Sequence, residues 1–121
     1  MTTANQQRGA VSYHAGLAAE RQVRERYIRQ GLRPVSQRWR GTAGEIDLIF
    51  DDRETLTFVE VKKSSTFEAA LQRLRPRQIK RLYQTAEEFS GQFPEPRELR
   101  FDLAVVDRQG RIETLENVFA L

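Results

Sequence analysis

The chain has 121 residues, a length that fits one hydrophobic core, and we expect residues 1–121 to form a single domain. It contains no cysteine, which excludes disulfides and thiolate metal sites and fits a reducing, cytoplasmic location. Its start lacks the apolar segment of a signal peptide, and its longest apolar run, residues 103–106, is far too short to cross a membrane.

Charge alternates in blocks along the chain, although the net charge is only +3. Residues 1–44 carry +6, residues 45–62 carry −4, residues 63–84 carry +5 and residues 85–121 carry −4. Of the 20 basic residues 17 are arginine, whose planar guanidinium group suits phosphate. The pattern fits either an ordinary solvated surface or a surface that binds a polyanion through its basic segments.

The first predicted helix runs from about residue 13 to residue 30, with Ser12 as its N-terminal cap and Gly31 as its C-terminal stop. The polar residues 1–11 before it are expected to be flexible. Glu20 lies beside the apolar stripe of this helix. It reaches solvent or, if the helix covers the sheet, points toward the sheet.

Residues 32–39 are predicted to form a strand, and Pro34 favours an edge position for it. The strand ends in Arg38, Trp39 and Arg40. A tryptophan between two arginines could stack on a nucleic-acid base or belong to the core, and the residues alone leave both alternatives open.

A hairpin follows, and it is acidic on one face. A four-residue turn would pair Phe50 with residue 55, which places Glu45 opposite Glu60 and brings Asp47 diagonal to Glu60. Because side chains alternate along a strand, Lys62 shares the face of these acids. Like charges on neighbouring strands repel, so the face is either a solvated edge or a site for a divalent cation.

Residues 67–74 are expected to form a short helix or turn, and a second long helix runs from Pro76 to Ser90. Cations oppose the dipole at a helix start, so basic residues there favour an external anion. Five basic residues gather at this start: Arg73, Arg75, Arg77, Lys80 and Arg81.

The last two predicted strands are residues 99–107 and 111–115. The expected order is therefore α-β-β-β-α-β-β. This order predicts an α/β (α+β) fold in which a mixed sheet of about five strands is flanked by helices.

The acidic face indicates a reaction class. Carboxylate oxygens suit Mg²⁺ or Mn²⁺, and Asp47 and Glu60 are the best candidate ligands. Lys62 could hold an attacking water or stabilise negative charge on a phosphate, which points to phosphodiester hydrolysis. The single histidine, His14, and the absence of cysteine leave no nucleophilic triad, and no glycine-rich phosphate loop is present.

Asp47 followed by Glu60-Val61-Lys62 resembles the PD-(D/E)XK signature of the restriction-endonuclease-like nuclease superfamily. The closer resemblance is to the YraN-like family of bacterial predicted endonucleases, and it covers nearly the whole chain. It rests on Gly16–Glu20, Tyr27–Gly31, Arg38-Trp39-Arg40, Gly44–Ile49, Phe58–Lys62, Ala86, Arg100-Phe101-Asp102 and Asn117-Val118-Phe119.

This resemblance implies a restriction-endonuclease-like sheet and a metal-dependent endonuclease that acts on DNA, with branched or single-stranded DNA as candidate substrates. It implies that Asp47, Glu60 and Lys62 are the catalytic residues. It further implies that Glu20 matches the first-helix acid of resolvase-like members and joins Asp47 and Glu60 as a metal ligand. Analogy with those members also suggests a homodimer.

Basic residues near the acidic face are the expected contacts to nucleic acid: Arg38, Arg40, Lys63, Arg75, Arg77 and Lys80. Ser64 and Gln78 stand where many family members carry Arg and Lys. This departure favours the alternative of a non-catalytic nucleic-acid-binding module that retains the nuclease fold. A third alternative is an assembly protein whose arginines bind an acidic partner. The resemblance assigns no role to Glu45 or Asp102; a structural role for Asp102, for example in an ion pair with an arginine of the first helix, is one alternative.

Overall fold

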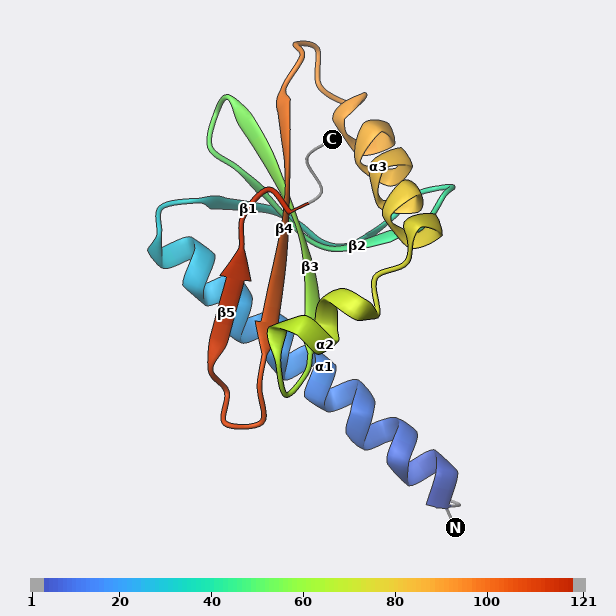
Figure 1. Ribbon diagram of the computed structural model, residues 1–121. Helices are drawn as coiled ribbons and strands as arrows, with labels where there is room; N and C mark the ends of the chain where they lie inside the picture. Colours follow the sequence, from blue (N-terminus) through green and yellow to red (C-terminus); the bar gives the residue numbers. More distant parts are fainter. Residues whose placement is uncertain (1–3, 119–121) are drawn as a thin grey trace.

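A computed structural model describes residues 4–118 of the chain and the side chains of residues 16–118. The described chain has three helices and five strands, and their order matches the prediction, with the short helix at residues 67–72 standing where a short helix or turn is expected. Figure 1 shows how these elements are arranged. The elements are α1 (Ala4–Arg29), β1 (Arg33–Arg40), β2 (Glu45–Asp51), β3 (Thr55–Lys63), α2 (Phe67–Gln72), α3 (Pro76–Ser90), β4 (Glu98–Val106) and β5 (Ile112–Leu115).

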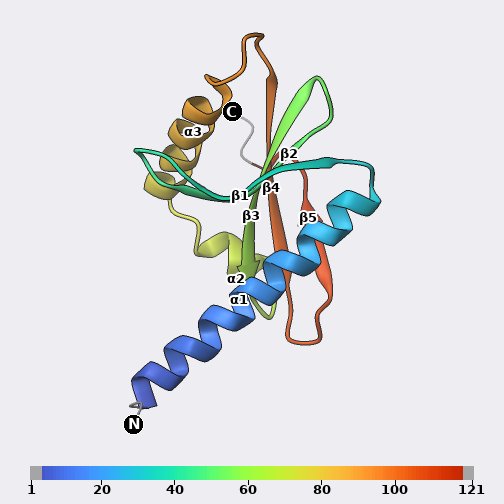
Figure 2. The same ribbon diagram turned by 180° about the vertical axis from the view of Figure 1, so that it is seen from behind.

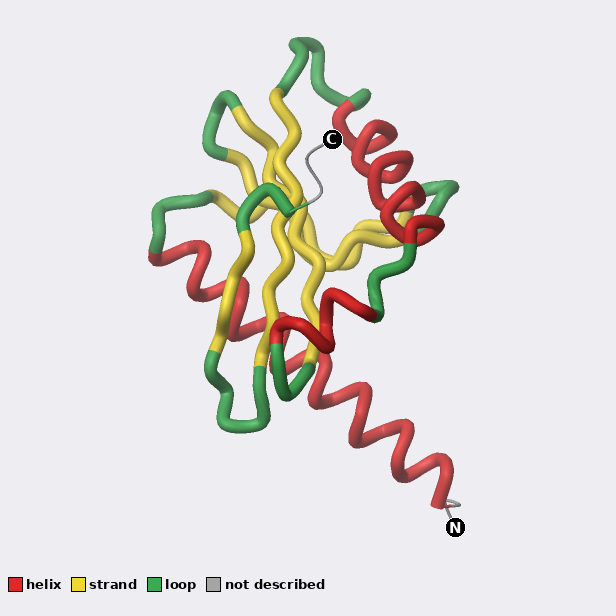
Figure 3. The backbone as a smooth tube through the Cα atoms, in the orientation of Figure 1, coloured by secondary structure: helices red, strands yellow, loops and turns green. Residues whose placement is uncertain are grey.

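The five strands form one mixed sheet, which confirms the predicted mixed sheet of about five strands, and their order in the sheet is β1-β2-β3-β4-β5. Strands β3 and β4 are parallel, whereas the other neighbours are antiparallel. A parallel pair needs a crossover connection, and α2 and α3 provide it. Figure 3 shows the chain passing from the end of β3 through these two helices to the start of β4.

Helices cover both faces of the sheet, and the opposite views of Figures 1 and 2 place α1 on one face and α3 on the other. The alternation along β3 explains this arrangement. Leu56 and Phe58 pack in the cluster that contains α3, whereas Val59 and Val61 pack in the cluster that contains α1. The predicted division of the two faces of β3 is therefore confirmed.

Helix α1 begins at Ala4, so the predicted start near residue 13 with Ser12 as its cap is wrong. Alanine, glutamine and arginine precede Ser12 in the chain, and these residues favour helix, which lets the backbone continue through it. The predicted end is confirmed, because the chain leaves the helix at Gly31 with φ +96°. Within residues 4–118 no helix combines the length and the apolar character needed to span a membrane.

The register of the β2–β3 hairpin differs from the prediction. Phe50 pairs with Thr57, not with Thr55, because β2 continues to Asp51 and leaves a tighter turn. The side chain of Asp51 is only 2% exposed, and it is held by Arg33 and by Arg97. The observed register carries Asp47 next to Glu60 rather than opposite Phe58.

The tip of the β1–β2 hairpin is fastened to α3. The amide and the hydroxyl group of Thr42 both donate to Glu88 Oε2, at 2.9 and 3.0 Å. A Cβ atom at Gly41 would lie 2.6 Å from the same oxygen and 2.7 Å from a ring carbon of Trp39, so only glycine fits there. This contact fixes β2 relative to α3.

Asp102, to which the sequence assigned no role, is held by structural contacts, and no arginine of α1 is among the partners described for it. Its carboxylate is fully buried and accepts hydrogen bonds from Tyr27 Oη at 2.7 Å and from Arg100 Nη2 at 2.8 Å. The amide of Asn117 donates at 2.9 Å. Tyr27 supplies the contact from α1, while the α1 residue Arg26 donates instead to the carbonyl oxygen of Ile112.

We expect Tyr27→Phe to lower the free energy of unfolding by about 2 kcal/mol, because it removes a donor from a buried charged carboxylate. Urea unfolding at neutral pH measures this loss. The matched control is Tyr83→Phe, since the Tyr83 hydroxyl donates to no side chain or carbonyl within the described chain. Equal stability losses in the two variants would contradict the role given to the Tyr27 hydroxyl group.

Candidate functional site

Adjacent strands place the two central acids of the candidate site. Asp47 lies in β2 and Glu60 in β3, and the hairpin register makes them neighbours. Asp47 Oδ2 accepts a hydrogen bond of 2.8 Å from the amide of Val61. Lys62 Nζ lies 3.2 Å from Glu60 Oε1, and this ion pair is largely shielded, with side-chain exposures of 24% and 11%.

Helix α1 brings a third acid to this place. Glu20 is mostly buried, and its Oε2 accepts a 3.0 Å hydrogen bond from Arg38 Nε. The negative charge of Glu20 acts on both Asp47 and Glu60. Of the two alternatives for Glu20, the structure therefore supports the one in which it points toward the acidic face.

Both central acids are hard to ionise. Burial is the largest cause, and it raises the pKa of Asp47 to about 6, helped by the charge of Glu20 and opposed by the Val61 amide. Burial also raises the pKa of Glu60 to about 7, helped by the charge of Asp47 and opposed by Lys62. Two close carboxylates with raised pKa values are typical of functional sites.

The chemistry of these donors fits a hard divalent cation. Mg²⁺ is commonly held by one or two carboxylates, with water and substrate phosphate supplying the remaining ligands, so Asp47 and Glu60 suffice as protein ligands. Among the described side chains, no group of three or more His, Cys, Asp or Glu residues stands ready to hold a metal. Glu20 would have to move closer to act as a third ligand.

Glu45, predicted to share the acidic face, lies at the exposed start of β2. Its Oε2 is 3.2 Å from Arg40 Nη2, with side-chain exposures of 37% and 80%. Its charge raises the pKa of Asp47 less than that of Glu20 does. Glu45 is therefore a surface ion-pair residue beside the site.

Trp39 is partly buried and packs against the core, which supports the core alternative for this residue. Its ring meets the edge of Phe89 with centroids 5.2 Å apart and the planes at 78°. It packs against the cluster between the sheet and α3. A base-stacking role would require the ring to leave this contact.

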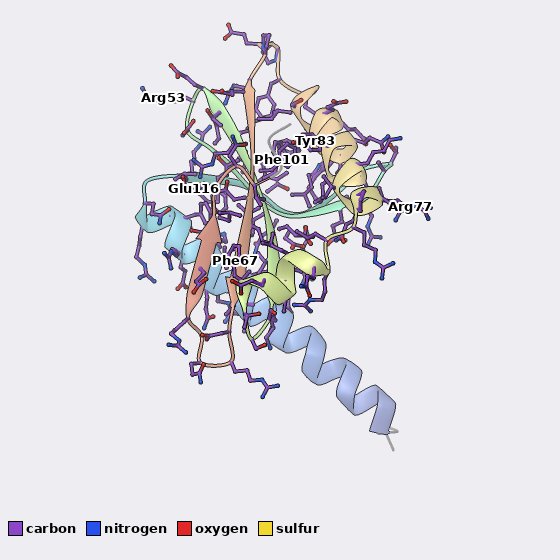
Figure 4. The ribbon with its side chains drawn as sticks, viewed as in Figure 1. Arg53, Phe67, Arg77, Tyr83, Phe101 and Glu116 are labelled. Carbon is purple, nitrogen blue, oxygen red and sulfur yellow. The ribbon has the colours of Figure 1, made fainter. Side chains whose placement is uncertain are left out.

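The basic residues expected to contact nucleic acid fall into two groups. Arg38 and Arg40 are engaged with acids of the chain itself. The others are exposed, and the described carboxylates form no ion pair with Arg75, Arg77 or Lys80. Figure 4 shows Arg77 pointing away from the molecule at the start of α3. This second group, which is free to meet an external anion, consists of Lys63, Arg75, Arg77 and Lys80.

Two features of the site were missed from the sequence. Nothing in the sequence indicated that the backbone amide of Val61 donates to Asp47 and orients its carboxylate. Arg38 was considered as a phosphate contact, whereas it binds Glu20. For the ion pair of Arg38 with Glu20, the sequence offered one signal, the alternation of basic and acidic segments around the hairpin.

The raised pKa of Glu60 predicts a pH-dependent stability difference. Folded Glu60 keeps its proton up to about pH 7, whereas an ordinary glutamate loses it near 4.5. Between these values the folded state binds more protons, so rising pH lowers its stability. We expect Glu60→Gln to gain stability relative to the unaltered chain as pH rises from about 5 to about 8, and to change little above that.

Urea unfolding in the presence of a chelator, at a series of pH values, measures this difference. The control is Glu45→Gln, which removes an exposed carboxylate of the same hairpin that lies outside the buried pair. A constant difference for Glu60→Gln across the range would contradict the raised pKa.

Comparison with known proteins places the chain in a family. Residues 19–106 match the model of "Uncharacterised protein family UPF0102". A UPF0102 protein of Roseobacter denitrificans is 44% identical over 98% of this chain and 94% of its own length. UPF0102 proteins of Cereibacter sphaeroides (strain KD131) and Ruegeria pomeroyi are 47% and 46% identical over 93% of this chain, and over 97% and 93% of their own lengths. The chain belongs to the UPF0102 family, the YraN-like family that its motifs indicate.

Proposed function

We propose that this protein is a metal-dependent endonuclease that hydrolyses phosphodiester bonds of DNA. The observation that carries the proposal is the burial of Asp47 beside Glu60, with Lys62 in contact. Such an arrangement raises the free energy of the ionised folded chain, so a structural role alone does not account for it. The resemblance of Asp47 and Glu60-Val61-Lys62 to the PD-(D/E)XK signature agrees with this proposal.

The side chains have distinct roles in the proposed reaction. Asp47 and Glu60 would hold Mg²⁺ or Mn²⁺, and the Val61 amide would orient the Asp47 carboxylate for this. The ion, when bound, would make a water more acidic and offset charge on phosphate oxygens. Lys62 would hold the attacking water or balance the negative charge that builds on the phosphate.

The exposed basic residues would bind the DNA backbone. Lys63 directly follows the strand that carries Glu60 and Lys62, and Arg75, Arg77 and Lys80 lie at the start of α3. Because they lack acidic partners within the described chain, phosphates can approach them without displacing an ion pair. Binding should therefore weaken steeply as the salt concentration rises.

Cleavage assays test the proposal. Purified protein is incubated with labelled branched, single-stranded and duplex DNA, with Mg²⁺ or Mn²⁺. We expect Asp47→Asn, Glu60→Gln and Lys62→Met each to reduce the rate by about 100-fold or more.

The matched control is Glu45→Gln, which removes an acid from the same hairpin but outside the buried pair and should retain activity. Cleavage that persists at full rate in both carboxylate variants would come from a contaminating nuclease and would refute the proposal.

A second candidate function is a non-catalytic nucleic-acid-binding module. Ser64 and Gln78 favour it, because they replace basic residues that many family members carry. On this alternative DNA binding would be sensitive to salt but indifferent to divalent ions.

Calorimetry with MnCl₂ separates the two functions. If the protein is a nuclease, we expect it to bind Mn²⁺ and Asp47→Asn to abolish this binding, because the substitution removes one of the two central carboxylates. The control Asp52→Asn changes an exposed turn acid and should leave Mn²⁺ binding intact. DNA binding without any Mn²⁺ binding in the unaltered chain would favour the non-catalytic module.

A further inference from the structure

Arg38 has a backbone conformation that arginine rarely adopts. Its φ is +50°, in the left-handed region, where a Cβ atom makes the conformation costly. Arg38 lies within β1, between the pair of Gln37 with Leu48 and the pair of Trp39 with Ile46, and not in a turn. Strain of this kind persists where surrounding contacts stabilise it, and it is concentrated at functional sites.

The side chain of Arg38 crosses from the sheet to helix α1. Its Nε lies 3.0 Å from Glu20 Oε2, and the two side chains are 32% and 12% exposed. By contrast, the nearby pair of Arg40 with Glu45 is 80% and 37% exposed. The Arg38–Glu20 contact is therefore a partly buried ion pair, screened less by water than an ordinary surface pair.

This ion pair lies against the acidic pair. The register of β1 with β2 brings Arg38 beside Asp47. The charge of Glu20 reaches both Asp47 and Glu60, which raises the pKa of each. Three neighbouring carboxylates repel one another, so Glu20 would turn to solvent unless a cation held it in place.

We propose that Arg38 is a positioning residue that holds the Glu20 carboxylate beside Asp47 and Glu60. The proposal deepens the proposed function and rests on it in one respect: Glu20, held near the two acids, would move closer to a bound metal ion and serve as a further ligand. With Oε2 bonded to Arg38, Oε1 is the oxygen that Glu20 would offer. In this role Arg38 contacts a carboxylate of its own chain and not a phosphate of the substrate.

The strained backbone offers a substitution that separates positioning from folding. Glycine adopts φ +50° without strain, so Arg38→Gly removes the side chain and relieves the backbone. Arg53→Gly is a matched control, because Arg53 has φ +84° but lies in the exposed β2–β3 turn. Arg40→Gly is a second control, because it removes a neighbouring arginine of the same strand that pairs with Glu45.

Calorimetric titration with MnCl₂ is the first measurement. We expect Arg38→Gly to raise the Kd for Mn²⁺ about tenfold, as loss of a residue that orients a metal ligand commonly does, and both controls to leave it unchanged. Glu20→Gln should raise it by a similar factor. The double variant should show no further loss, because each substitution removes the same carboxylate from the site. Unchanged affinity in Arg38→Gly, or losses that multiply in the double variant, would overturn the proposal.

Urea unfolding of the same variants in a chelator is the second measurement, and it does not depend on metal. If Arg38 holds Glu20, then Glu20→Gln shifts the urea midpoint in the unaltered chain but not in Arg38→Gly. Equal shifts in both backgrounds would overturn the positioning role. Unequal shifts would support it even if the unaltered chain bound no Mn²⁺, a result that would refute only the proposed nuclease.

Discussion

Two carboxylates buried side by side are the constraint on which the rest of this structure depends. Asp47 and Glu60 repel each other whenever both are ionised, and burial strengthens that repulsion. The chain nevertheless keeps them together through the hairpin register, with one amide and one lysine to moderate the repulsion. A fold selected for stability alone would place an apolar pair at such neighbouring positions.

Other buried acids of the same chain show how a carboxylate is satisfied when its role is structural. For Asp51 burial would raise the pKa, but the Arg53 amide and the guanidinium groups of Arg33 and Arg97 hold it below its usual range. Asp102 accepts from a tyrosine, an arginine and an amide. The acidic pair has fewer donors than either, and this shortage is what distinguishes it physically as a candidate site.

The sequence predicted what depends on local periodicity. Alternation along β3 gave the two faces of the sheet, and the position of Gly31 gave the end of α1. The acids of the candidate site followed from the same alternation. Local patterns carry this information because a strand exposes its residues to opposite faces whatever its partners are.

Contacts between distant residues decided the rest. The hairpin register differs from the prediction because β2 continues to Asp51, and Arg97, which binds Asp51 from 46 positions away, leaves no pattern within the hairpin. Likewise, the positive φ of Arg38 has no signature in a sequence, since arginine is not among the residues that favour this conformation. The contact of Asp51 with Arg97 and the backbone conformation of Arg38 exist only in the assembled fold.

The contact between Thr42 and Glu88 bears on how much entropy the chain would lose when it binds a ligand. It joins the β1–β2 tip to α3, and Ile46 of β2 packs with Leu82 of α3 in one core cluster, so the strand that carries Asp47 is held against the helix that carries Arg77 and Lys80. A polyanion that bridged them would find both halves of its binding surface already in place. Little chain entropy would be lost on association, and more of the contact energy would appear as affinity.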